Sequence, residues 1–347
     1  MATKPSPRLM TEAVFIRRVL IVVGIAVFIS VLYLLSDILL LAFGAVLVAV
    51  VLRSIAGPIE GSMSISDRLA IVAAALGAIA VLGGVGFLYG AQISSQLAGL
   101  FDNLPAAATS LSKSGHFPSV SELIKGSSIG NLVVSAFSWG TTVFGAAATL
   151  VVVIVAGVYI AIDPDVYRNG FLKLFPSRVR AQIGETIDDS GGALRLWLGA
   201  QAVSMILVGV LTGAGLAFIG VPSALGLGLI AGVTEFVPIV GPLIGAIPTL
   251  LLASTVSLEM VLWTMLLFVV VQQVESNIIT PLVARRAVKL PPAVGLFAVV
   301  AIGILFGPLG LLLGYPLAIV ADVAVRRLYV RETLGEDVEI AGENDAA

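Results

Sequence analysis

Long apolar runs separated by short polar stretches dominate this chain. Residues 19–35 and 38–52 are each close to the length of a helix that spans a bilayer. Only Ser36 and Asp37 separate the two runs, which predicts a tight helical hairpin. The polar stretch 53–68 contains a Gly-Pro pair at residue 57, and such a pair is typical of a loop.

The middle of the chain alternates in the same way. A third apolar run covers 69–90, and residues 91–138 are polar with apolar positions at helical spacing, which predicts an amphipathic helical segment. A fourth apolar run covers 139–162, and a fifth covers 198–219. The charged stretch 163–197 between them is expected to be a solvated loop.

The next apolar segment, 224–254, is interrupted where a spanning helix would be continuous. Each proline in it removes a backbone donor and clashes with the preceding turn, so an unbroken helix is not expected. The residues that crowd the interruption are Pro238, Gly241, Pro242 and Pro248. The last apolar segment, 294–325, carries a similar breaker at Gly307-Pro308.

Charge distribution predicts the orientation of these segments. Hydrophobic residues make up 59% of the chain and charged residues 12%, which indicates a polytopic membrane protein. Of the 19 lysines and arginines, only Lys113 and Lys125 fall within 91–138. The positive-inside rule therefore places 91–138 outside the cell and both termini in the cytoplasm. With that orientation, 224–254 and 294–325 must each fold back on themselves, from opposite faces.

We therefore predict an all-α polytopic membrane protein with about eight membrane elements. Two of them are broken or re-entrant hairpins, and paired broken segments of opposite orientation are typical of an inverted repeat in a secondary transporter. The expected parts are three N-terminal spans (1–90), an extracytoplasmic amphipathic segment (91–138), a fourth span with a cytoplasmic loop (139–197), a transport core (198–325) and a cytoplasmic tail (326–347).

Two carboxylates are candidates for the chemistry of this core. Glu235 lies about ten residues into its hairpin, or roughly 15 Å deep, where an ionised carboxylate costs several kcal/mol unless it is paired or wet. It is expected to bind a proton or cation, or alternatively to bond free amides near a helix end. Glu275 follows the apolar run 260–271 within a polar series and is expected to orient substrate or hold the helix. The amides of that series are Gln272, Gln273 and Asn277.

Other classes of protein find little support. There is no cysteine, His116 is the sole histidine, and no His-Glu-x-x-His zinc motif or phosphate-binding loop occurs. We therefore expect no enzymatic activity and no metal or cofactor. The net charge of −2 shows no basic excess, so we expect no nucleic-acid partner either. Asp322 is expected to pair with Arg326, four residues later.

The residues from Glu235 to Pro242 (EFVPIVGP) and from Gln272 to Pro281 (QQVESNIITP) resemble the autoinducer-2 exporter family of bacterial transporters. Phe306-Gly307-Pro308 fits the same resemblance, whereas the turn 285–289 is more basic than is usual in the family. The resemblance implies an eight-element protein of the bacterial inner membrane, surrounded by lipid. It also implies a homo-oligomer, for which a pentamer is one arrangement.

The expected function is secondary active export of a small polar molecule such as autoinducer-2. Two alternatives remain open: a sodium/proton antiporter that uses the same carboxylates, and a membrane scaffold that transports nothing. The expected substrate- or ion-binding residues are Glu235, Pro238, Gly241, Pro242, Gln272, Gln273, Glu275, Asn277, Gly307 and Pro308.

Overall fold

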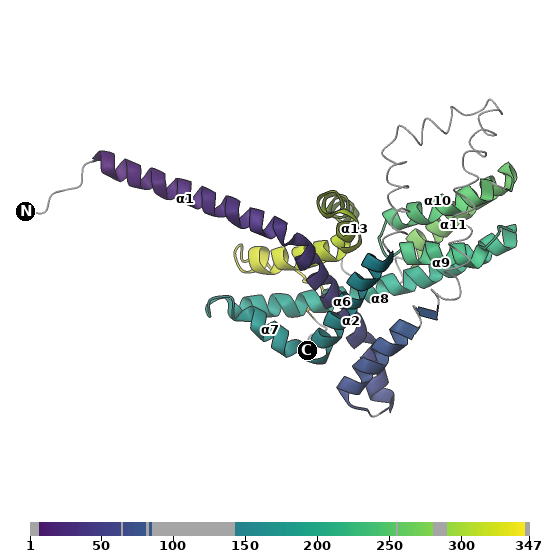
Figure 1. Cartoon of the computed structure of the whole chain (residues 1–347), viewed down its shortest axis with the longest axis horizontal. Coiled ribbons are helices and arrows are strands. Elements are labelled where there is room, and N and C mark those ends of the chain that lie inside the picture. The colour runs from purple at the N-terminus through teal and green to yellow at the C-terminus, as the bar shows by residue number, and fades with distance from the viewer. Residues whose placement is uncertain are drawn as a thin grey trace, which may run out of the picture. The chain divides into compact units, whose positions relative to one another are not determined.

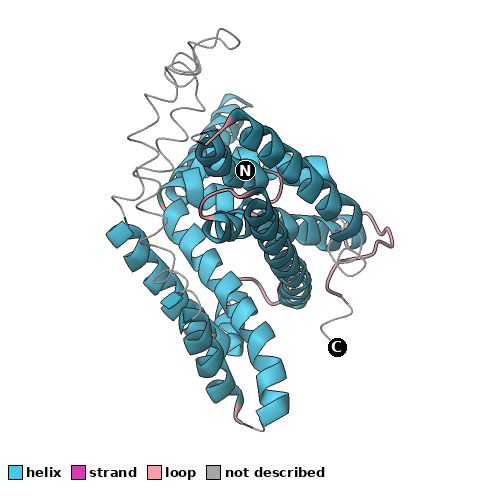
Figure 2. Ribbon diagram, turned by 90° about the vertical axis from the view of Figure 1, so that its right-hand side faces the viewer, coloured by secondary structure: helices cyan, strands magenta, loops and turns pink. Residues whose placement is uncertain are grey.

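The structure is a computed structural model that describes residues 7–63, 65–80, 83–84, 143–254, 256–279 and 290–343. Every regular element in these ranges is a helix, which confirms the all-α class (Figure 2). Five helices are long and apolar enough to cross a membrane, or up to six if one bent pair counts as a span. The predicted amphipathic segment 91–138 and the basic turn 285–289 lie outside the described residues.

Figure 1 labels the helices along the chain. Their bounds are α1 (Pro7–Leu34), α2 (Ser36–Met63), α6 (Val143–Ile162), α7 (Pro164–Leu172), α8 (Arg180–Ile219), α9 (Ala224–Thr234), α10 (Val240–Ser254), α11 (Leu258–Val274), the π-helical turn η2 (Glu275–Ile279), α13 (Pro292–Ala324) and the π-helical segment η3 (Val325–Arg331). Residues 67–80 are also helical. The chain divides into two compact units, Met1–Phe43 and Gly44–Ala347.

In the first unit, the predicted tight hairpin between the first two apolar runs is wrong. The amide of Leu35 donates to the carbonyl of Val31 at 2.9 Å, and the amide of Leu39 donates to that of Leu35 at 2.9 Å. The Ser36 hydroxyl donates to the carbonyl of Tyr33 at 2.7 Å. Helical hydrogen bonds on both sides of Leu35 leave no room for a reversal, because a hairpin turn would break them.

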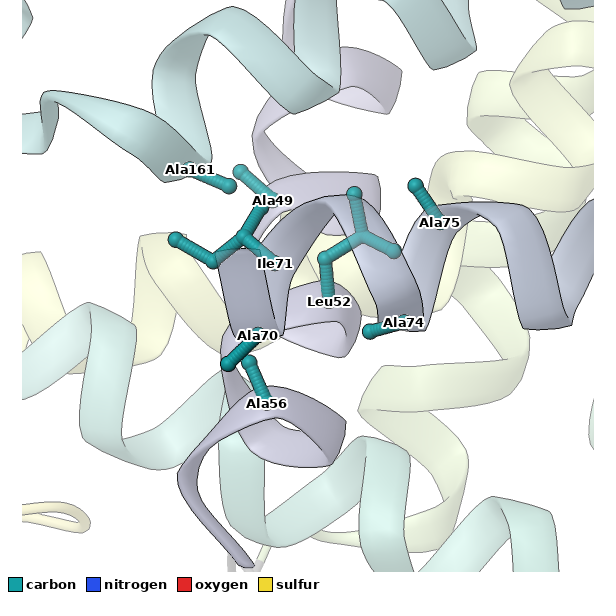
Figure 3. Close-up of a cluster of buried hydrophobic side chains, with 8 residues drawn as sticks. All are labelled: Ala49, Leu52, Ala56, Ala70, Ile71, Ala74, Ala75 and Ala161. Carbon is teal, nitrogen blue, oxygen red and sulfur yellow. The ribbon is translucent and has the colours of Figure 1, made fainter. Parts of the chain in front are cut away.

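The second unit corrects the expected loop at 53–68. Helix α2 continues to Met63 and contains Pro58. A proline strains a helix partly through the Cβ of the preceding residue, and Gly57 has none, so this particular pair is tolerated. Beyond α2, alanines of the 67–80 helix and of α6 pack against it in a buried cluster (Figure 3). The members are Ala49, Leu52, Ala56, Ala70, Ile71, Ala74, Ala75 and Ala161.

The charged stretch 163–197 is helical rather than a loop. Helix α7 turns away from α6 by 89°, and α8 begins at Arg180, well before the predicted fifth span. With 40 residues, α8 is about 60 Å long, which exceeds the thickness of a bilayer core. The polar residues Thr186, Asp189 and Ser190 lie on a buried face of its first half. That face is covered, so a helix there is stable despite its charges.

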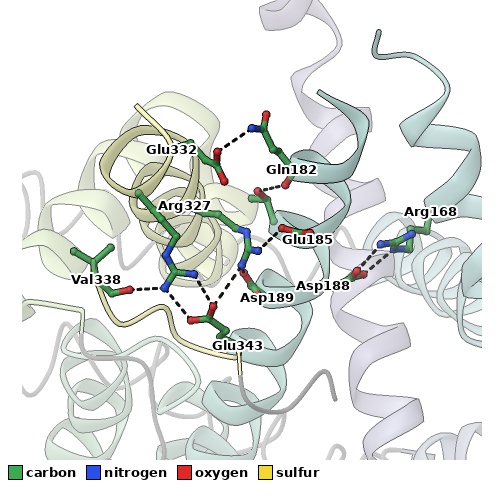
Figure 4. A network of polar contacts seen from close by, with 11 residues as sticks. Arg168, Gln182, Glu185, Asp188, Asp189, Arg327, Glu332, Val338 and Glu343 are labelled. Atoms are coloured by element: carbon green, nitrogen blue, oxygen red, sulfur yellow. Dashed lines mark hydrogen bonds and ion pairs between the residues drawn. The ribbon is translucent and has the colours of Figure 1, made fainter. Parts of the chain in front are cut away.

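The end of the chain covers this face through ion pairs (Figure 4). The guanidinium of Arg327 contacts the carboxylates of both Glu185 and Asp189, and Arg331 pairs with Glu343. Gly342, at φ +86°, lies so close to α8 that a Cβ there would be 2.3 Å from the carbonyl oxygen of Asp189. The C-terminal segment is therefore docked on the N-terminal half of α8.

Two smaller results concern the same end of the molecule. The predicted pair between Asp322 and Arg326 is confirmed, with Nε and Oδ2 at 2.7 Å. The hydrogen bond from Arg331 lowers the pKa of the Glu343 carboxyl below its usual range, with a smaller opposing effect of burial.

Candidate functional site

The predicted break in 224–254 is confirmed, because α9 ends at Thr234 and α10 begins at Val240. Gly241 closes the turn: its amide donates to the carbonyl of Val237 at 2.7 Å, and a Cβ on it would lie 2.0 Å from the carbonyl oxygen of Thr234. Ile239 has φ +72°, a strained backbone for a β-branched residue. The turn is thus tightly built, and only a glycine fits at 241.

Pro238 lies in this turn and Pro242 in the first turn of α10, whereas Pro248 does not end a helix. Helix α10 runs through Pro248 to Ser254. The hydroxyl of Thr249 donates to the carbonyl of Gly245 at 2.9 Å within the same stretch. The interruption is therefore confined to residues 235–239.

Glu235 is the first residue of the turn and is 2% exposed. The side-chain amide of Gln201, on α8, donates to its backbone carbonyl. Its carboxyl atom Oε2 has no hydrogen-bond partner among the described residues. The expected alternative, a glutamate whose carboxylate bonds free amides at a helix end, is therefore not satisfied at this atom.

Glu275 lies beside Glu235. It is the first residue of η2, and its side chain lies close enough to the Glu235 carboxyl to interact with it. The amide of Gln272, three residues earlier, donates to Glu275 Oε2. The turn of α9–α10 and the end of α11 thus bring together two carboxyl groups, of which that of Glu235 is buried and that of Glu275 is half-buried.

The other amides of the series lie elsewhere. Gln273 and Asn277 are exposed, and the Asn277 amide donates to the carbonyl of Gln273 at 2.9 Å. Among the described parts of the chain, no three His, Asp or Glu side chains gather in a way that could hold a metal ion.

The segment 294–325 folds back on itself as predicted. Gly307, with φ +65° and ψ −146°, interrupts α13 immediately before Pro308. A Cβ on Gly310 would lie 2.2 Å from the carbonyl oxygen of Ile302, and a Cβ on Gly314 would lie 2.9 Å from the Cα of Val299. The two arms of α13 are therefore packed against each other. Only glycine readily adopts the backbone of Gly307.

Helix α8 holds both hairpins, and α9 packs along its C-terminal half (Figure 1). A Cβ on Gly228 would lie 2.5 Å from the Cα of Gly213, and one on Gly232 would lie 2.6 Å from the carbonyl oxygen of Met205. Small residues therefore let the two backbones touch. Helices α9 and α8 run antiparallel, so that Gly228 and Gly232 are followed along this contact by Glu235, which meets Gln201.

The second hairpin meets α8 from the opposite end. Arg327 contacts Asp189, and Tyr315 contacts Trp197. The second arm of α13 therefore also runs antiparallel to α8, and its turn at Gly307 points toward the C-terminal end of α8. Measured along α8, the two hairpin turns point in opposite directions. Their contacts overlap at Trp197, which also meets Phe236 of the first turn.

Two residues that contact the turn, Trp197 and Gln201, were not predicted from sequence. They are buried and share one face of α8 with Ser204 and Thr212, which are also buried. Their spacing of three to eight residues is compatible with a single helical face, but the run 198–219 is otherwise so apolar that it reads as an ordinary span. Tyr315 was not predicted either, because it lies in the apolar segment 294–325.

Comparison with known proteins identifies relatives of this chain. A family model described as AI-2E family transporter matches residues 19–329. The transport-protein candidate YueF of Bacillus subtilis (strain 168) is 27% identical over 297 residues, which cover 79% of this chain and 80% of YueF.

Two further relatives match over a shorter stretch. The transport-protein candidate YrrI of the same organism is 33% identical over 165 residues, which cover 48% of this chain and 47% of YrrI. The candidate MT0215 of Mycobacterium tuberculosis is 28% identical over 175 residues, or 50% of this chain and 47% of MT0215. The chain thus spans about half the length of these two relatives. Since the family model covers nearly all of it, the chain belongs to the AI-2E transporter family.

Proposed function

We propose that the chain is a secondary active transporter that exports a small polar molecule, such as autoinducer-2, across the bacterial inner membrane. In this proposal the carboxyl pair of Glu235 and Glu275 is the translocation site. The observation that carries it is the buried Glu235 carboxyl, whose Oε2 has no partner among the described residues and which faces a second carboxyl group.

Electrostatics explains why such a pair supports transport. Two carboxylates at short range repel each other when both are ionised, and burial adds a desolvation cost to each charge. A proton or a cation between them removes most of the repulsion and lowers the desolvation cost. A site that is stable only when it is occupied can couple the movement of an ion to a change of conformation, and that coupling defines secondary transport.

The arrangement of the hairpins supports the same function. Irregular backbone is tolerated at membrane depth where protein or a water-filled cavity surrounds it, and the turn at Glu235 lies against α8 through Gln201 and Trp197. Two broken segments that point in opposite directions along α8 fit an inverted repeat with the site between its halves. Rocking of one hairpin against the other would then expose Glu235 to each side in turn.

A sodium/proton antiporter is the second candidate, and the carboxyl pair itself favours it. A site built from two carboxyl groups and the Gln272 amide offers oxygen atoms, which hard cations prefer. In either case we propose that the protein forms a homo-oligomer in the lipid bilayer. The apolar side chains of α1 are exposed from Val14 to Leu34 and need a covering of lipid or of other subunits.

Purified protein in sealed liposomes separates these functions. Efflux of labelled autoinducer-2 supports export, and a response of an enclosed pH dye to added sodium supports antiport. Glu235→Gln should abolish the pH dependence of whichever flux is observed. Glu259→Gln, at the exposed start of α11, is the matched control and should leave the flux unchanged. No flux under either condition would favour a scaffold and refute the proposal.

A further inference from the structure

We propose that Trp197 is a positioning residue that couples the movements of the two hairpins. The inference rests on the proposed transport function for its purpose, but the contacts that carry it do not. Trp197 lies on α8, is 5% exposed and belongs to neither hairpin, yet its indole ring touches both.

The two ring contacts have different geometries. The indole is stacked on Tyr315 of the second hairpin, with ring centroids 5.6 Å apart and planes inclined by 22°. It meets Phe236 of the first hairpin edge to face, at 5.6 Å and 73°. Both are favourable arrangements for aromatic pairs, and both fix the direction of the rings as well as their distance.

Each partner ring is attached to the moving part of its hairpin. Phe236 directly follows Glu235 in the turn. Tyr315 lies in the second arm of α13, and its ring fills the space beside Gly295 in the first arm, where a Cβ would lie 2.5 Å from Cε2. A displacement of either hairpin must therefore move a ring that Trp197 contacts.

Trp197 also shares a helical face with the residue that holds Glu235. Gln201 is four residues further along α8, so the two side chains lie one above the other. Gln201 binds the backbone of Glu235 while Trp197 contacts the ring of Phe236. Helix α8 thus contacts the first turn through two side chains, Trp197 and Gln201. Trp197 contacts the second hairpin as well.

The inference predicts that loss of the indole frees the turn without emptying the site. Two single-cysteine proteins test this in a chain that has no cysteine of its own. Val240→Cys reports on the turn, and Leu225→Cys, exposed at the start of α9, is the control position. Each is labelled with a membrane-impermeant maleimide in sealed liposomes, with and without Trp197→Ala. This measurement requires no transported substrate.

We expect Trp197→Ala to raise the labelling rate at residue 240 by about tenfold and to leave residue 225 within about twofold, because the population of displaced turns rises. Trp197→Phe, which keeps an aromatic ring, should restore most of the original rate. Unchanged labelling at 240 would overturn the inference. An equal rise at both positions would overturn it too, since that means general loosening. If Trp197→Ala does not fold, Tyr315→Leu removes the stack from the other side and predicts the same pattern.

Transport gives a second readout. If the wild type carries labelled autoinducer-2 or exchanges sodium for protons, Trp197→Ala should lower the maximal rate by about tenfold and change the half-saturating concentration by less than about twofold. A raised half-saturating concentration with an unchanged maximal rate would make Trp197 a binding residue and refute the coupling role. A silent wild type refutes the proposed function instead, and the labelling pattern still decides the role of Trp197.

Discussion

The side chain of Glu275 lies close enough to the carboxyl group of Glu235 to interact with it, although the two residues are 40 positions apart in sequence, with the complete helices α10 and α11 between them. Glu235 belongs to a turn between two short apolar helices, whereas Glu275 begins the π-helical end of a long one. A like-charged pair in a buried place is costly unless something neutral or positive lies between the groups. In the proposed transport function, the two glutamates therefore act as one site.

The two glutamates should nevertheless respond differently to substitution. Glu235→Gln keeps the shape of the side chain and removes its charge, so we expect transport to lose its dependence on pH while the protein still assembles. Glu275 accepts a hydrogen bond from Gln272, and Glu275→Gln should mainly weaken apparent affinity or assembly. Liposome flux between pH 5.5 and 8.5 measures the first effect. An unchanged pH profile for Glu235→Gln would transfer the coupling role to Glu275.

The close contact of α8 with α9 predicts that larger residues destabilise the hairpin. A Cβ at Gly228 would lie 2.5 Å from backbone of α8, and backbone cannot move aside cheaply. Gly228→Ala should cost about 1–3 kcal/mol of stability, as overpacking of a core does. Thermal unfolding in detergent measures the loss. Gly199→Ala is the control, because a Cβ there meets nothing within 4 Å and should be neutral or slightly stabilising.

Docking of the C-terminal segment should be sensitive to acid. The pKa of Glu343 is lowered in the folded protein by the hydrogen bond from Arg331, so its contribution is present above the ordinary glutamate pKa of about 4.3 and is lost as pH falls through the lower folded value. Once corrected for the slower intrinsic exchange of amides in acid, hydrogen exchange at Ile340 and Gly342 should therefore accelerate as pH falls.

At neutral pH, Glu343→Gln should reproduce this faster exchange, because it removes the charge that Arg331 binds. Glu336→Gln, at an exposed position of the same segment, is the control and should exchange like the wild type. Equal exchange in both variants would mean that Gly342 and the neighbouring backbone, rather than the ion pair, hold the segment on α8.

The opposite directions of the two hairpins predict opposite accessibility of their turns. Single cysteines at Val240 and Phe306 should react with impermeant reagents from different sides of a sealed vesicle. Vesicles of known orientation, labelled from outside and then after permeabilisation, distinguish the sides. Reaction of both cysteines from the same side only would contradict the inverted-hairpin topology.

The sequence by itself determined the helical class, the family and two points where helices break, residues 235–239 and Gly307. These features are local: prolines remove backbone donors, and the glycines at 241 and 307 allow turns that other residues resist. The same local rules gave wrong predictions at two places. Gly57-Pro58 did not end α2, and 163–197 formed helices, because buried faces and ion pairs can stabilise a helix whose composition suggests a loop.

Only the tertiary structure decided which residues meet. The pairing of Glu235 with Glu275, the hold of Gln201 on the turn and the stack of Tyr315 on Trp197 join elements that are distant in sequence. Such contacts depend on the register at which α9 and α13 lie along α8. That register follows from where glycines let backbones approach and where the C-terminal ion pairs close, and a pattern of apolar and polar positions along one chain does not contain it.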